Sequence, residues 1–191
     1  MSEPGHHHVC PFWIGYLLAS PLRKFWHNPN KILSPYLKPD MQVLDFGSAM
    51  GFFSLPMAKM VGPSGKVICI DIQEKMIKRL KERAQKANLL DRIETHVCSE
   101  TSLGLDRFDG VLDFALAFAV VHEVPDPVLF FSQMYRSLKD SAKILIAEPN
   151  KRVSPEDFQA TINTALSQGF HLACRPSIWA VSAAVLEKPA I

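Results

Sequence analysis

The chain has 191 residues and a formal net charge of +2, with 48% hydrophobic and 21% charged residues. This length favours one domain with a sizeable core, and a charge so near neutrality gives no argument for a nucleic acid partner. The sequence has no run of about 18 apolar residues and no basic segment followed by an apolar one. We therefore expect a cytoplasmic protein without a membrane span or a secretory signal.

The first 40 residues differ from the rest because they hold six of the fourteen prolines. Proline interrupts helices, so we expect only short helices here, near 12–19, 21–27 and 29–37. Apolar residues dominate between the prolines. We predict that residues 1–40 form a helical lid, and that residues 41–191 form the main domain on which this lid packs.

From residue 41 onward, strand-like apolar runs alternate with helix-like amphipathic runs. We predict strands at 41–46, 66–71, 93–98, 108–117, 143–147, 170–175 and 179–187. The helices should lie at 51–61, 74–87, 127–138 and 155–168. Ser154 is the expected N-cap of the last helix. Such alternation predicts a parallel sheet covered by helices on both faces, and the last two strands are close enough in sequence to pair antiparallel.

The strongest local signal is the stretch Asp45-Phe46-Gly47-Ser48-Ala49-Met50-Gly51, where a buried strand leads through small residues into a helix. Small residues let the backbone approach a ligand, and the first turn of a helix offers free N–H groups. Asp71 ends the next strand, where a carboxylate can accept hydrogen bonds from both hydroxyls of a ribose. A dinucleotide site would need a third glycine at position 52, but Phe52 stands there.

The chain from about residue 40 to 188 resembles the class I S-adenosylmethionine-dependent methyltransferases. It is most similar to small bacterial and archaeal members of the group that includes ubiquinone/menaquinone and arsenite methyltransferases. The resemblance rests on four segments, which are the loop at 45–51, the strand at 67–71, the stretch from Phe108-Asp109 to His122-Glu123-Val124-Pro125-Asp126, and the stretch from Leu138 to Lys143 with Glu148-Pro149. It implies an α/β, Rossmann-like fold with a seven-stranded, mostly parallel sheet whose last strand is antiparallel.

Two departures from the family pattern occur. Ala49 replaces the middle glycine of the first motif, and Lys139-Asp140-Ser141-Ala142 replaces a proline–glycine–glycine turn. Alanine adds one methyl group and is often tolerated in place of the middle glycine if its φ is negative.

The resemblance also implies roles for individual residues. Gly47 and its neighbours would face the methionine part of the cofactor, and Asp45 would lie near its amino group or order the loop. Asp71 would hold the ribose and Ile72 would lie against the adenine. Ser99 and Glu100 would lie near the adenine amino group, and Ala117 and Phe118 near the sulfonium. The other expected cofactor contacts are Asp45, Gly47, Ser48, Ala49, Gly51, Phe52, Asp71 and Ile72.

Methyl transfer from a sulfonium is an in-line displacement, in which the protein aligns the reactants and excludes water. A base helps only if the nucleophile arrives protonated. His122 is the candidate base, because it follows the fourth strand and an imidazole titrates near neutrality. Glu123 is a candidate to orient it or to bind a cationic group. The alternative is that His122 packs locally and Glu123 faces water.

A second candidate site lies at the N-terminus. Imidazole and thiolate groups suit zinc, another soft or borderline metal, or a soft substrate. The residues concerned are His6, His8 and Cys10. A solvated N-terminal segment is the alternative.

The sequence thus predicts methyl transfer from S-adenosylmethionine to a small-molecule acceptor. One alternative is a non-enzymatic metal- or cofactor-binding protein that uses the N-terminal histidines and cysteine. The other is a nicotinamide-dependent oxidoreductase, although no Tyr–Lys pair lies near the fourth or fifth strand. No nucleic acid partner is expected, because the basic helix at 74–87 has no aromatic residues between its charges.

Overall fold

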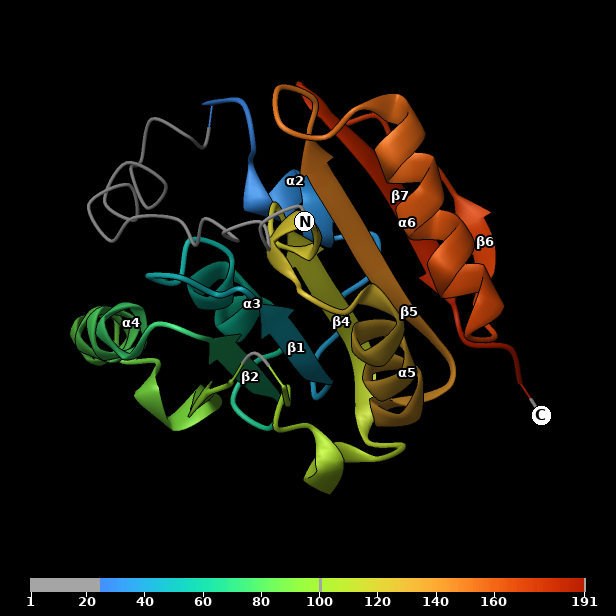
Figure 1. The fold of residues 1–191 in the computed structure, drawn as a ribbon. Coiled ribbons are helices and arrows are strands. Elements are labelled where there is room, and N and C mark those ends of the chain that lie inside the picture. The colour runs from blue at the N-terminus through green and yellow to red at the C-terminus, as the bar shows by residue number, and fades with distance from the viewer. Residues whose placement is uncertain (1–24, 100, 191) are drawn as a thin grey trace.

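The computed structural model describes residues 25–99 and 101–190. The strands in these ranges form one seven-stranded sheet in the order β3-β2-β1-β4-β5-β7-β6 (Figure 1). Five strands are parallel, and β7 runs antiparallel to both of its neighbours. The strand bounds are β1 Gln42–Phe46, β2 Lys66–Asp71, β3 Ile93–Val97, β4 Leu112–Phe118, β5 Leu138–Pro149, β6 His171–Cys174 and β7 Val181–Glu187. The seven-stranded, mostly parallel Rossmann-like α/β sheet with a reversed last strand is therefore confirmed.

Helices cover both faces of the sheet (Figure 1). One face packs against α2 Pro29–Leu33, α3 Ser54–Met60 and α4 Glu74–Lys86, and the other against α5 Pro127–Ser137 and α6 Pro155–Ser167. Short 3₁₀ helices lie in the connections, among them η2 Leu90–Arg92, η3 Asp106–Phe108 and η4 Val121–Glu123. Within the described residues, no helix has the length and apolar character that a membrane span needs.

Alternating side chains of the central strands supply two cores, because successive residues of a strand point to opposite faces. In β1, Val43 packs in the core below α3, whereas Leu44 and Phe46 pack in the core below α5 and α6. The second core includes Phe130 and Phe158, both at most 2% exposed. Burial on both faces explains why these strands read as nearly continuous apolar runs.

Two strands differ from the sequence prediction. β4 begins at Leu112 rather than at 108, because residues 106–108 form η3 and Gly110 turns the chain with a φ of 66°. β5 begins at Leu138 rather than at 143. Its register to β4 shifts between the pairs Leu112–Leu138 and Phe114–Lys143, so the polar residues 139–142 form a bulge in one long strand instead of a separate turn.

The expected lid is described only at its end. The helix expected at 12–19 and most of that at 21–27 lie outside the described residues. The third expected helix is shorter than predicted, since α2 ends at Leu33. Asn28 caps it by accepting a hydrogen bond from the Asn30 N–H at 3.0 Å. Leu33 and Leu37 are buried against the sheet, so this part of residues 1–40 packs on the main domain.

The cap of α6 gives a test of local stability. Ser154 Oγ accepts a hydrogen bond from the Asp157 N–H at 3.1 Å. Ser154→Ala should lower the free energy of unfolding by about 1 kcal/mol, because a helix N–H loses its partner. Ser167→Ala at the other end of α6 serves as the control, because the Ser167 hydroxyl donates to the Thr164 carbonyl and accepts from the Gln168 side chain but caps no helix N–H. Equal midpoints of urea denaturation for the two variants would contradict the capping role.

Candidate functional site

The parallel strands end together at one edge of the sheet. Phe46 of β1 lies opposite Ile70 of β2 and Ala117 of β4, and Phe118 lies opposite Ala147 of β5. The loops that follow these strands therefore meet at one place, as expected for the ligand-binding edge of an open α/β sheet. All the described candidate residues of the cofactor site lie at or next to this edge.

The loop after β1 lies close to the loop after β4. The N–H groups of Gly47 and Ser48 both donate to the Ile70 carbonyl, at 2.9 and 3.0 Å. Gly47 has a φ of 71°, and a Cβ at this position would lie only 2.6 Å from Cγ2 of Val120. Position 47 thus needs glycine for its conformation and for the close approach of the two loops. Gly51, with a φ of 81°, completes the turn into α3.

Ala49 does not meet the condition under which alanine easily replaces the motif's glycine. Its φ is 45°, in the left-handed region. The physical reason is the turn itself, which points the Ala49 N–H at Asp71. That N–H donates to Asp71 Oδ2 at 2.9 Å, and this bond helps to hold the strained residue.

Asp71 joins two loops at the end of β2. Its second oxygen, Oδ1, accepts a hydrogen bond from the Gln73 N–H at 2.9 Å. The carboxyl group is only 9% exposed. Burial raises the pKa of Asp71, while the N–H groups of Gln73 and Ala49 act in the opposite direction. The carboxylate expected to hold a ribose is therefore in place and rigidly oriented.

Ser48 and Asp45 lie below the same loop. Ser48 is 4% exposed, and its Oγ has no hydrogen-bond partner among the described residues. Such a buried hydroxyl calls for an explanation, and a bound ligand supplies one. Ser54 Oγ donates to Asp45 Oδ2 at 2.5 Å, which favours the loop-ordering role of Asp45 over direct cofactor contact. The Phe52 ring packs edge-on against Phe53 within the core.

The segment after β3 borders Asp71 on its other side. The Cys98 N–H donates to the Asp71 carbonyl at 3.2 Å. Burial, with the nearby Asp71 charge, raises the pKa of the Cys98 thiol to about 11. Ser99 Oγ accepts from the Ser102 N–H at 3.1 Å, and Ile72 is 37% exposed beside this segment. Four expected site residues lie outside the described ranges, namely His6, His8, Cys10 and Glu100.

The end of β4 lies beneath residues that precede α2. Ala117 is fully buried, and the Phe118 ring is 7% exposed. The Phe118 ring centroid lies 4.7 Å from that of Phe53 and 5.2 Å from that of His27. His27 Nε2 is also 2.9 Å from the carbonyl oxygen of Trp179, in the connection between β6 and β7. The described end of the expected lid therefore touches the strand end predicted to lie near the sulfonium.

His122 lies in η4, just after β4, where it pairs with a carboxyl group that sequence reasoning missed. Its Nδ1 is 2.5 Å from Glu148 Oε2, and the Val121 N–H donates to Glu148 Oε1 at 2.7 Å. Glu148 is 1% exposed near the end of β5. Glu123 Oε1 lies 3.8 Å from His122 Nε2 and 3.7 Å from Nη1 of Arg152. The sequence shows an acidic residue near the end of β5, but its pairing with His122 depends on the contact between β5 and η4 in the assembled sheet.

Comparison with known proteins agrees with this geometry. Residues 37–179 match the methyltransferase domain family. The chain belongs to this family. The resemblance to the class I S-adenosylmethionine-dependent methyltransferases is thereby confirmed, and the match gives no support to an oxidoreductase or a non-enzymatic binding protein.

Relatives and solved structures are similar over most of the domain. The ubiquinone/menaquinone biosynthesis C-methyltransferase UbiE of Bordetella parapertussis is 29% identical over 73% of this chain and 52% of its own length. The arsenite methyltransferase of Halobacterium salinarum is 28% identical over 64% of this chain and 31% of its own length. A solved SAM-dependent methyltransferase from Aquifex aeolicus has a TM-score of 0.84 at 25% identity, covering 94% of this chain and all of that one. This chain spans between a third and a half of the length of the curated relatives it matches.

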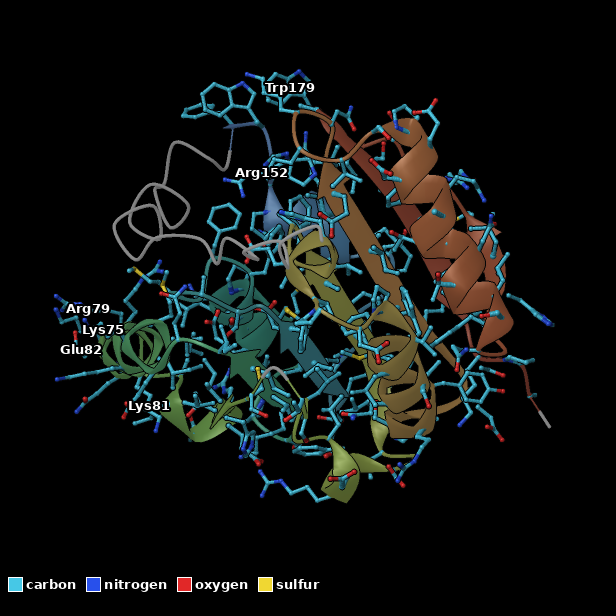
Figure 2. The ribbon with its side chains drawn as sticks, viewed as in Figure 1. Lys75, Arg79, Lys81, Glu82, Arg152 and Trp179 are labelled. Atoms are coloured by element: carbon cyan, nitrogen blue, oxygen red, sulfur yellow. The ribbon has the colours of Figure 1, made fainter. Side chains whose placement is uncertain are left out.

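The charged face of α4 points away from the site of this methyltransferase domain. Lys75, Arg79, Lys81 and Glu82 project outward from the helix, whereas Arg152 and Trp179 lie toward the carboxyl edge of the sheet (Figure 2). Arg79 pairs with Glu82 at 2.6 Å, as expected for a solvated helix face. Arg83 is the exception, because its Nη1 donates to the Met50 carbonyl and so ties α4 to the loop after β1.

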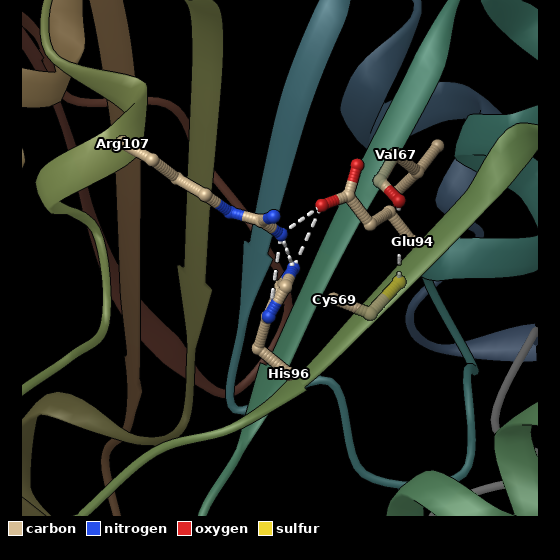
Figure 3. A network of polar contacts seen from close by, with 5 residues as sticks. All are labelled: Val67, Cys69, Glu94, His96 and Arg107. Atoms are coloured by element: carbon tan, nitrogen blue, oxygen red, sulfur yellow. Dashed lines mark hydrogen bonds and ion pairs between the residues drawn. The ribbon is translucent and has the colours of Figure 1, made fainter.

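A second polar network of the methyltransferase domain lies on β3 (Figure 3). Glu94 Oε1 is 2.9 Å from His96 Nε2 and also accepts from Arg107, which in turn contacts the His96 ring. Arg107 lies 4.8 Å above the Phe108 ring. These contacts hold η3 against β3 and so fix both ends of the connection that includes Ser99. The role of this network is therefore to stabilise the fold.

An open groove of about 500 Å³ lies between the residues around α2 and the connection from β6 to β7. The described residues of its walls are mostly aromatic and apolar and include the cation Lys31. The aromatic lining residues are Phe25, Trp26, Tyr36 and Trp179. The described residues contain no group of three His, Cys, Asp or Glu side chains able to hold a metal ion.

The contact between the two loops can be tested at position 47. Gly47→Ala should lower the free energy of unfolding by about 2–4 kcal/mol, because the methyl group meets Val120 and φ is positive. Gly104→Ala is the matched control, since its φ is 69° and nothing lies within 4 Å of the added Cβ. Only the strain cost of about 1 kcal/mol should remain there.

Adding Val120→Ala to Gly47→Ala should restore part of the lost stability, because the closest contacts of the new methyl group are Val120 side-chain atoms. Denaturant unfolding of the wild type, Gly47→Ala, Gly104→Ala and the double variant measures how much stability the second substitution restores. Equal losses for Gly47→Ala and Gly104→Ala would show that the loops do not need this close approach.

Proposed function

We propose that this chain binds S-adenosylmethionine at the loop 47–51 and Asp71, and transfers its methyl group to a small-molecule acceptor. The observation that supports this most is the buried Asp71 carboxylate, which is bonded to the loops after β1 and β2. Beside it, Ser48 offers a buried hydroxyl without a partner among the described residues. Both features fit an adenosyl and methionine ligand lying across the loop.

The residues have separate tasks in this proposal. Asp71 holds the ribose, Ile72 lies against the adenine, and the N–H groups of the loop with Ser48 face the methionine part. S-adenosylmethionine supplies a methyl group already activated by a positive sulfur. The protein then contributes mainly alignment and exclusion of water, which account for much of the rate in such displacements.

His122 is the proposed general base for a methyl acceptor that arrives protonated. It lies at the end of the strand next to β1, and one of its ring nitrogens, Nε2, has no hydrogen-bond partner among the described residues. Glu123 lies between His122 and Arg152. In this proposal it orients the imidazole of His122 or binds a cationic group of the methyl acceptor.

Two observations favour a small methyl acceptor. The groove of about 500 Å³ has the size of many small-molecule sites, and His27 connects its Trp179 wall to the end of β4. The names of the relatives above also refer to ubiquinone/menaquinone biosynthesis and to arsenite. Residues 1–40 would act as the lid over this edge, and the metal or soft-substrate role of His6, His8 and Cys10 stays a prediction.

Cofactor binding tests the proposal through Asp71. Asp71→Ala should weaken binding of S-adenosylhomocysteine by about 10- to 100-fold, since hydrogen bonds to a charged group contribute about 1.5–3 kcal/mol. Isothermal titration calorimetry measures this, with Asp91→Ala as a control on an exposed carboxylate. Unchanged affinity in Asp71→Ala would remove the basis of the proposed cofactor site.

The role of His122 predicts a pH dependence. The hydrogen bond that His122 donates to the Glu148 carboxylate raises the pKa of His122 above its ordinary value of 6.5, and burial opposes this shift. Only the neutral imidazole accepts a proton, so kcat should rise as pH increases through the raised pKa and then level off. His122→Ala should lower kcat by about 10²- to 10⁴-fold with little change in S-adenosylhomocysteine affinity.

The assay is transfer of a labelled methyl group to a panel of quinols, thiols, amines and metalloids. Because the pKa of His122 is raised, the imidazole stays protonated, and kcat stays low, up to a higher pH than for an ordinary histidine. A kcat that is independent of pH in the wild type, or equal losses of kcat and cofactor affinity in His122→Ala, would reject a base at this position.

A further inference from the structure

Glu148 is a buried carboxyl group whose two oxygens have different partners. Oε1 accepts a hydrogen bond from the Val121 N–H at 2.7 Å, and Oε2 lies 2.5 Å from His122 Nδ1. The residue is 1% exposed, and among the described residues its ion-pair partner is His122 rather than a lysine or an arginine. A short contact between a carboxylate and an imidazole N–H is a strong, directional hydrogen bond.

This contact determines which ring nitrogen of His122 holds the proton. An ionised carboxylate only accepts hydrogen bonds, so Nδ1 must be the protonated nitrogen of the neutral ring. Nε2 then has a lone pair. Nε2 is buried without a hydrogen-bond partner among the described residues, and the nearest charged oxygen, Oε1 of Glu123, is 3.8 Å away. The lone pair is therefore available to a group with a proton to give.

We propose that Glu148 is a positioning residue that fixes the Nδ1–H tautomer of His122, and that the methyl acceptor is consequently a proton-bearing nucleophile such as a hydroxyl, a thiol or a carbon acid. This inference rests on the proposed methyl transfer and identifies the class of methyl acceptor. The nucleophile forms a bond to the methyl carbon and the carbon–sulfur bond breaks with its electron pair left on sulfur. The proton of the nucleophile moves to His122 Nε2, and His122 later releases it to water.

The charges around His122 are consistent with this proton path. Glu148 from β5 and Glu123 from η4 favour the protonated ring that forms during the reaction, whereas Arg152 and burial oppose it. Glu148 has the largest effect on the pKa of His122 because it is hydrogen-bonded directly to the ring. The same pairing that orients the neutral base therefore also stabilises the imidazolium that follows.

A purely structural role for Glu148 predicts different behaviour. Glu148 also fastens the loop after β4 to β5 through the Val121 N–H. Glutamine has the same shape and can keep that bond through its carbonyl oxygen. Its NH₂ group, however, would donate to Nδ1, and this would force the proton of the neutral ring onto Nε2. Glu148→Gln thus keeps the loop in place, but Nε2 of the neutral His122 ring no longer has a lone pair that can accept a proton.

The experiment is nitrogen-15 NMR of the histidine side chains in the full chain without ligand. The wild type should show a protonated Nδ1 and an unprotonated Nε2 for His122 at high pH, and Glu148→Gln should show the reverse tautomer with a lower His122 pKa. Glu187→Gln is the matched control, since Glu187 pairs with Lys143 on the same sheet and does not contact His122. Thermal unfolding of all three proteins checks that each is folded.

Turnover provides the second measurement. With a methyl acceptor from the panel, Glu148→Gln should lower kcat by about 10²-fold or more, while S-adenosylhomocysteine affinity stays within about twofold of the wild type. An Nε2–H tautomer in the wild type, or an unchanged tautomer in Glu148→Gln, would overturn the role of Glu148. The tautomer is read without any ligand, so a wild type that has it but binds no S-adenosylhomocysteine would contradict the proposed function alone.

Discussion

The carboxylate of Asp71 holds the ligand edge of this sheet together. It accepts one N–H from the loop after β1 and another from the loop after β2, so the two segments that would contact an adenosyl group share one anchor. Burying a charge is costly unless hydrogen-bond donors replace the lost water, and here two backbone donors do so. The loop geometry and the proposed ribose-binding group are consequently parts of the same interaction.

Two alanines at the same edge have a strained backbone. Ala49 and Ala119 have φ values of 45° and 59°, just beyond the ends of β1 and β4. Each alanine is held by a hydrogen bond from its own N–H, to Asp71 in the first case and to the Ala147 carbonyl, at 2.7 Å, in the second. Non-glycine residues in this region cost about 1–2 kcal/mol each, and such positions gather at functional sites because the surroundings over-determine them.

The sequence predicted the elements whose signal is local. The β1 loop, Asp71 at the end of β2 and the Ser154 cap follow from residue type and spacing, and the structure has them where expected. The positive φ of Ala49 could not be predicted locally, because it depends on a hydrogen bond to a residue 22 positions away. The bulge at residues 139–142 depends on pairing with β4, and Glu148 was overlooked because only the assembled sheet brings β5 beside η4. Pairing across the sheet is the information that local patterns lack.

The indole rings of Trp26 and Trp179 stack with centroids 6.0 Å apart and an interplanar angle of 29°. They come from segments on opposite sides of the groove, and the chain has only three tryptophans. Two of the three indole fluorophores of the chain thus report on a single edge of the molecule. Stacked indoles also couple electronically, so near-ultraviolet circular dichroism would register any separation of these two segments without an added label.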